Sequence, residues 1–188
     1  MRTFASSIIA AAMIGVSGLT AYAGAPATTA VRSFSDGSVV PGSSASLVRT
    51  DAGVSAMLAT SGLPGGDVVT MWWVVFNHPE NCAGPSAGHP FQCGRSDLGN
   101  PAVEASVLFA AGRVTTNGGA GDFGAHLSVG DTSGALFGPG LLFPQSAHVH
   151  LVLHDHGPAD ARIISQELHS FDVCNPTCVD VQFAVFES

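Results

Sequence analysis

Four histidines alternate with other residues along one short stretch of the sequence. The run from His148 to His156 reads His-Val-His-Leu-Val-Leu-His-Asp-His. In an extended strand successive side chains point to opposite faces of the sheet, so the imidazoles would share one face and most apolar residues the other. A helix would scatter them, because its period is 3.6 residues. The run therefore predicts a strand with an imidazole face, and the members of this histidine row are His148, His150, His154 and His156.

Imidazoles two residues apart on a strand can ligate one metal ion. Their Cα atoms lie about 6.6 Å apart, and ring nitrogens at that spacing can converge on an ion at about 2.0 to 2.1 Å. About 20 Å of strand separates His148 from His154, so the row predicts two half-sites, His148 with His150 and His154 with His156. Neutral imidazole suits copper and zinc. We therefore expect copper or zinc binding in a non-enzymatic role, as metal capture or a structural site.

Each half-site needs at least one further ligand. His126 falls on the polar face of a strand predicted over residues 122–130. If that strand paired with the histidine strand, His126 could join His148 and His150, because opposite residues have Cβ atoms about 4.5 to 5.5 Å apart. Other histidines could complete the second pair, namely His78, His89 or His169. The predicted metal ligands are His126, His148, His150, His154 and His156.

Two alternatives to a non-enzymatic metal site follow from the same residues. The tripeptide His148-Val149-His150 resembles the copper-ligand tripeptide of the Cu/Zn superoxide dismutases, which are also glycine-rich sandwiches with a disulfide. That resemblance covers the tripeptide and implies a metal-dependent redox enzyme.

The tripeptide followed by Gly157-Pro158 is also similar to CHRD-type extracellular domains. The other alternative is an extracellular surface or interaction module without metal, in which the row is a solvated polar face. Whether the chain is an enzyme is not decided by these residues.

The N-terminus has the pattern of a secretory signal peptide. An uncharged, largely apolar stretch follows Arg2 and ends at Ala21-Tyr22-Ala23, a small-x-small cleavage pattern. We expect residues 1–23 to be removed, which predicts a secreted or periplasmic protein without membrane attachment after cleavage. Residues 24–44 are rich in small residues and predict a poorly ordered lead-in. The remaining residues, 45–188, are predicted to form one domain.

The charge balance limits the partners. The chain has 14 acidic residues against six arginines and no lysine, which gives a net charge of −8 with histidine neutral. Nucleic acid is therefore excluded as a partner. The arginines are dispersed, so no basic patch predicts binding to anionic lipid. A metal ion is the predicted partner.

The four cysteines of an exported chain predict disulfides. Three pairings are open, and proximity in the sequence favours Cys82 with Cys93 and Cys174 with Cys178. A four-cysteine zinc site would instead need reduced thiolates, which an oxidising compartment disfavours.

The rest of the chain reads as short strands separated by turns rich in glycine and proline. In residues 68–76, bulky apolar residues occupy both odd and even positions, so both faces of a strand would be apolar. This predicts a central strand covered on both faces. Residues 77–101 lose this periodicity and hold two cysteines, so we expect a long stapled loop, of a kind that often carries function. Seven or eight strands without a convincing helix predict an all-β fold, a single antiparallel β-sandwich of Ig-like, Greek-key type.

Overall fold

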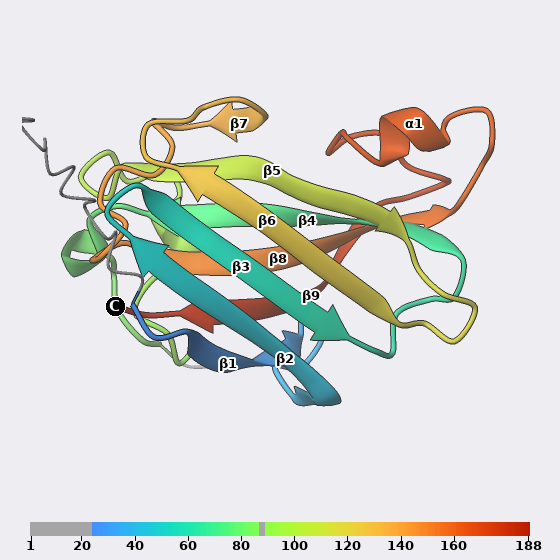
Figure 1. Ribbon diagram of the computed structural model, residues 1–188, viewed down its shortest axis with the longest axis horizontal. Coiled ribbons are helices and arrows are strands. Elements are labelled where there is room, and N and C mark those ends of the chain that lie inside the picture. The colour runs from blue at the N-terminus through green and yellow to red at the C-terminus, as the bar shows by residue number, and fades with distance from the viewer. Residues whose placement is uncertain (1–23, 87–88) are drawn as a thin grey trace, which may run out of the picture.

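The computed structural model describes residues 24–86 and 89–188 (Figure 1). The predicted signal peptide lies outside the described residues. The strands are β1 (Ala27–Ser33), β2 (Val39–Thr50), β3 (Gly53–Thr60), β4 (Asp67–Phe76), β5 (Ala105–Val114), β6 (Gly121–Ser128), β7 (Ala135–Phe137), β8 (His148–Pro158) and β9 (Val179–Phe186). The short helical elements are η1 (Pro79–Asn81), η2 (Arg95–Asp97) and α1 (Ile164–Glu167). The prediction of an all-β fold is confirmed.

The strands form one antiparallel sheet that curls into a half-barrel. Its order is β6-β3-β2-β1-β9-β8-β4-β5-β7 (Figure 1). β5 and β6 lie far apart in this order, yet they contact each other across the curl. The fold is therefore not clearly the two-sheet sandwich that the sequence predicts.

The difference from a sandwich arises at β1. This strand pairs with β2 on one side and with β9 on the other, so it joins two groups of strands into one sheet. The prediction that residues 24–44 form a poorly ordered lead-in is wrong, because these residues contain β1 and the beginning of β2. Main-chain pairing on both edges orders the segment despite its small side chains.

The main hydrophobic core fills the inside of the curl. Trp73 and Met71 of β4 pack there with Leu151 of β8 and Leu58 of β3. β4 is buried on both faces, as its sequence predicts. Trp72, next to Trp73, points away from this core and lies on the opposite face of the sheet.

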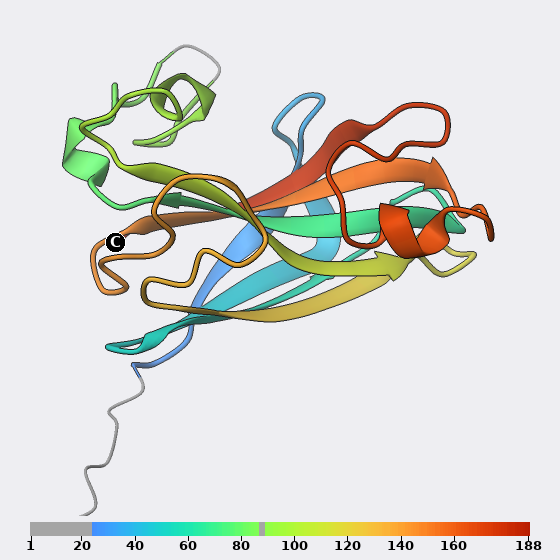
Figure 2. The same cartoon turned by 90° about the horizontal axis from the view of Figure 1, so that it is seen from above.

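That opposite face is covered by two segments that lack regular strand structure. One is the stapled loop, predicted over residues 77–101, which in the structure extends to residue 104 and packs a second small core around Phe76, Cys93 and Val103. The other is the C-terminal cover, residues 159–178, which contains α1. Figure 2 shows the stapled loop at one end of the sheet and α1 at the other. Each cover lies over part of the face that carries the histidine row.

Both predicted disulfides are formed, Cys82 with Cys93 and Cys174 with Cys178. Two disulfides suggest a non-cytoplasmic, oxidising environment. Within residues 24–86 and 89–188, no helix has the length and apolar character needed to cross a membrane.

Candidate functional site

The histidine row lies on β8, between β9 and β4, as an extended strand. The apolar residues between the histidines, Val149, Leu151 and Leu153, enter the main core and are fully buried. The four imidazoles share the opposite face, as predicted, but none is solvated, since each histidine is at most 8 % exposed. This burial excludes the interpretation of the row as a solvated polar face.

The first end of the row, His148 and His150, faces the stapled loop. The His150 ring lies 4.9 Å from the ring of Phe76 and 6.4 Å from that of Phe91, measured between centroids. Nε2 of His150 and Nδ1 of His148 are buried without a hydrogen-bond partner among the described residues. A buried polar atom left in that state costs about 1 to 3 kcal/mol, so this end of the row has unused hydrogen-bonding capacity.

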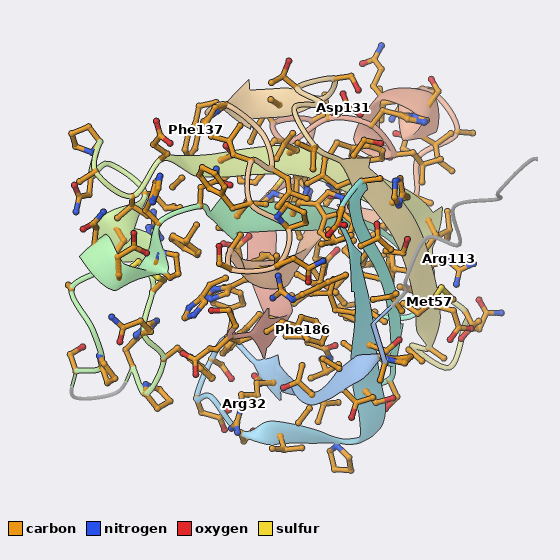
Figure 3. All side chains as sticks on the ribbon, turned by 60° about the vertical axis from the view of Figure 1, so that its left-hand side comes forward. Arg32, Met57, Arg113, Asp131, Phe137 and Phe186 are labelled. Atoms are coloured by element: carbon orange, nitrogen blue, oxygen red, sulfur yellow. A yellow bond between two sulfur atoms is a disulfide. The ribbon has the colours of Figure 1, made fainter. Side chains whose placement is uncertain are left out.

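His150 lines an apolar cavity of about 360 Å³, here called the aromatic pocket. Its floor is the outer face of the sheet, where Trp72 and Val152 lie on neighbouring strands. Phe137, which lies near the margin of the sheet beside β5 (Figure 3), contributes from β7. The phenylalanines of the lining are Phe34, Phe76, Phe91, Phe137, Phe171 and Phe183.

Burial keeps the imidazole of His150 neutral. Burial, together with the positive charges that would form on His148 and His89, lowers the pKa of His150 to about 3. Burial also lowers the pKa of His148. A neutral imidazole has one N–H donor and one acceptor nitrogen, so His150 can exchange a hydrogen bond with a polar group in the pocket.

A disulfide and a buried carboxylate tie together the described part of the stapled loop beside the pocket. Its disulfide includes the fully buried Cys93. The buried carboxylate of Asp97 accepts hydrogen bonds from the main-chain N–H of Ala83, at 2.9 Å, and of Gly94, at 2.8 Å. Gly94 also gives room to His89, because a Cβ atom there would lie 2.5 Å from Nε2 of that ring. These contacts connect the part of the loop that lines the pocket, which includes His89 and Gly94, to the rest of the loop.

The buried His150 makes stability depend on pH. In the unfolded chain a histidine has a pKa near 6.5, whereas in the folded protein that of His150 is about 3. The unfolded state therefore binds the proton first, and the stabilisation is present above about pH 6.5 and is lost as the pH falls toward 3. We expect the free energy of unfolding, from urea titrations, to fall by up to about 1.4 kcal/mol per pH unit for this group.

The variant His150→Asn should reduce this slope. His126→Asn is the matched control, because His126 is exposed on β6, and it should leave the slope as in the wild type. An unchanged slope in His150→Asn would show that His150 does not cause the pH dependence.

The second end of the row begins with His154. Its Nδ1 lies 2.7 Å from Oδ1 of Asp180 on β9, and its ring stacks on Phe171 at a centroid distance of 4.2 Å. The carboxylate fixes the tautomer with the proton on Nδ1. Nε2 is then an acceptor, and it is buried with no partner in the part of the chain that the structure describes. A histidine held by a carboxylate in this way is the usual form of a metal-ligating histidine.

His156 has both ring nitrogens engaged. Nε2 lies 2.8 Å from the Thr70 hydroxyl, which in turn accepts a hydrogen bond from Nε1 of Trp72 at 2.7 Å. Nδ1 donates to the carbonyl oxygen of Val173 at 2.7 Å. His156 is fully buried, and burial lowers its pKa. In this arrangement the imidazole is a neutral structural group.

Only one group of three potential metal-ligating side chains lies together within the described part of the chain. It consists of His154, His156 and Cys178, whose ligand atoms are all within 4.8 Å of one another. Cys178 is bonded to Cys174, and a disulfide sulfur is not a thiolate ligand. The group could hold a metal, but in the present disulfide form it offers mainly nitrogen donors.

The other predicted ligands lie elsewhere. β6 pairs with β3 rather than with β8, so His126 is exposed and contacts the Ser55 hydroxyl at 2.9 Å. The predicted approach of His126 to His148 and His150 is wrong, because four strands separate β6 from β8 in the sheet order. His78 pairs with Glu80 and Glu104, and His169 contacts the carbonyl oxygen of Ser165. Of the histidines suggested as completing ligands, His89 lines the aromatic pocket together with His150.

Comparison of the chain with protein-family models, with curated proteins and with solved structures found no match.

Proposed function

We propose that this is a secreted or periplasmic protein that binds a small, largely apolar molecule with one polar group in the aromatic pocket. One observation carries the proposal. A neutral imidazole, His150, is more than nine-tenths buried in the wall of a pocket lined by aromatic rings, and its Nε2 has no hydrogen-bond partner among the described residues. Apolar pockets with a few convergent polar groups are the usual form of small-molecule sites.

The size of the pocket sets the class of ligand. Its volume of about 360 Å³ is at the small end of the range for ligand pockets, about 300 to 1,000 Å³. Aromatic walls favour a flat ring system, which can pack edge to face against phenylalanine. The polar group of the ligand would exchange a hydrogen bond with His150.

The lining favours binding over catalysis. The side chains that surround the pocket include no serine, threonine, cysteine or lysine among the described residues, so a conventional activated nucleophile is not found there. The one carboxylate of the lining, Asp180, is occupied by His154.

A second hollow supports a ligand site less well. It has a volume of about 790 Å³ but is more open, and residues 33–41 and 179–182 supply much of its lining. It contains no histidine of the row. The smaller pocket is favoured because it is less open, more apolar and holds the buried imidazole.

The experiment is a titration with N-phenyl-1-naphthylamine, an apolar dye with one N–H group whose fluorescence rises in apolar surroundings. The protein without residues 1–23 should bind one dye molecule saturably, and 2-naphthol should displace it. A linear, non-saturating rise in fluorescence would contradict a defined pocket.

A second candidate function is the binding of copper or zinc at the His154 end of the row. The observation that favours it is the Asp180–His154 pair, which leaves an unpartnered, buried Nε2 beside His156 and Cys178 in the described structure. His148 and His150 belong to no group of three donors among the described residues. A redox enzyme of the dismutase type, which would use those two histidines, is therefore not proposed.

A further inference from the structure

The Cys174–Cys178 disulfide is placed to control the metal site at the His154 end. This inference rests on the second candidate function and adds its regulation. Cys178 Sγ lies 3.5 Å from Nδ1 of His156. Two ligands on one tetrahedral zinc ion, a nitrogen at about 2.0 Å and a sulfur at about 2.3 Å, are about 3.5 Å apart. The spacing of these two atoms is therefore already that of ligands to a common ion.

The histidines can supply two nitrogens without rearrangement of the sheet. His154 keeps its hydrogen bond to Asp180 and offers Nε2, which is buried and unpartnered within residues 24–86 and 89–188. His156 needs a change of tautomer. The Thr70 hydroxyl can accept as well as donate, so a proton on Nε2 would be satisfied by Thr70 when Nδ1 releases Val173 and takes the ion. Each ring would then be oriented by a second hydrogen bond, as in known metal sites.

The sulfur donors are masked by oxidation. In the disulfide neither Cys174 nor Cys178 is a thiolate. Their separation of four residues gives the spacing C-x₃-C, which falls within that of structural zinc sites. Once reduced, Cys178 would be the third ligand and Cys174, its bonded neighbour in the oxidised form, the fourth.

The two disulfides differ in access to a reductant. Cys174 and Cys178 are both half-buried, on the surface segment 159–178. In the other disulfide Cys82 is half-buried as well, but Cys93, within the stapled loop, is fully buried. Thiol–disulfide exchange requires attack on a sulfur atom, so an external dithiol should open the first bond, which has no fully buried sulfur atom, more readily than the second.

We propose that a dithiol reductant converts this end of the row into a tetrahedral zinc site formed by His154, His156, Cys174 and Cys178. The dithiol supplies two electrons and two protons. The S–S bond breaks, both cysteines become thiols, and the dithiol closes into its own disulfide. Zinc then displaces the two thiol protons to solvent and binds two thiolates and two neutral imidazoles, a donor set typical of zinc.

The test uses Co²⁺ as a spectroscopic substitute for zinc. The protein is treated with dithiothreitol without oxygen, desalted and titrated with Co²⁺, in parallel with untreated protein. We expect one equivalent to give tetrahedral d–d bands and a thiolate charge-transfer band in the reduced protein only, and Zn²⁺ to displace it. Equal tetrahedral binding to the oxidised protein would overturn the redox control but leave metal binding intact. No binding in either form would overturn both.

Variants separate ligands from structural effects. Asp180→Asn keeps the size of the side chain but removes the charge that raises the basicity of His154, and it should weaken Co²⁺ binding to the reduced protein by about 10- to 100-fold, as mutation of the partner of a metal-ligating histidine does. His126→Ala, on the exposed face of β6, is the control and should bind as the wild type. Uptake that persists in the double variant Cys174→Ser/Cys178→Ser would place the ion on other residues and overturn the proposal.

Discussion

Replacing Val152 with tryptophan should weaken the binding of N-phenyl-1-naphthylamine by about a hundredfold or more. Val152 is half-buried and lines the aromatic pocket, between His150 and His154 on the outer face of β8. An indole at this position would occupy space that the dye needs. The dye would then lose most of its apolar burial, at about 25 cal/mol for each Å². Fluorescence titration at increasing protein concentration measures the change.

The control is the same substitution outside the pocket. Val114 is 40 % exposed at the end of β5 and does not line the pocket, so Val114→Trp should bind the dye as the wild type does. Near-ultraviolet circular dichroism and the urea midpoint check that Val152→Trp is folded. A folded Val152→Trp protein with unchanged dye affinity would place the dye elsewhere.

The largest effect on stability is expected for Thr70→Val. The Thr70 hydroxyl is fully buried and joins Nε1 of Trp72 to Nε2 of His156. Valine has nearly the same shape but no hydrogen-bonding group, so both nitrogens would remain buried without a partner. Each unsatisfied group costs about 1 to 3 kcal/mol, and we expect a total loss of about 3 kcal/mol in the free energy of unfolding.

Thr70→Ser separates the hydroxyl from the methyl group. Serine retains the hydrogen bonds, so its loss should be about 1 kcal/mol, the cost of one buried methyl group. Both values come from urea unfolding at neutral pH. If Thr70→Val and Thr70→Ser were equally stable, the link between Trp72 and His156 would contribute little.

The histidine strand is predicted well from the sequence because the pattern that identifies it is local to the strand. Alternation over nine residues fixes both the strand and the sorting of its two faces, and β8 has the expected arrangement. Short spacing along the chain likewise predicts both disulfides. The apolar run of β4 correctly predicts a strand covered on both faces.

The strands that neighbour β8 in the sheet could not be predicted, because strand order depends on contacts between distant segments. His126 lies on a polar strand face, as expected, but that strand is at the edge of the sheet next to β3. The single curled sheet depends on β1, a segment of small residues whose composition predicts disorder. Its order comes from main-chain pairing, which leaves little trace in side-chain patterns.

The sequence also does not reveal what covers the imidazoles. The important neighbours are Phe91 in the stapled loop and Phe171 in the C-terminal cover, each far from β8 in the sequence. Asp180 was not among the predicted site residues, although it orients His154 from the neighbouring strand. One sequence signal points to this packing: the large apolar residues Phe91 and Leu98 stand among small and polar residues in the stapled loop, which indicates that the loop packs against another part of the molecule.

The most direct measurement compares two ligands that differ by one hydroxyl group, 2-naphthol and naphthalene, in the wild type and in His150→Leu. If the pocket holds an aromatic ligand against His150, the preference for 2-naphthol should fall about five- to tenfold in the variant, the value of one hydrogen bond between neutral groups. Naphthalene itself should bind both proteins with similar affinity. An undiminished preference for 2-naphthol in His150→Leu, or no saturable binding of either compound to the wild type, would contradict the account.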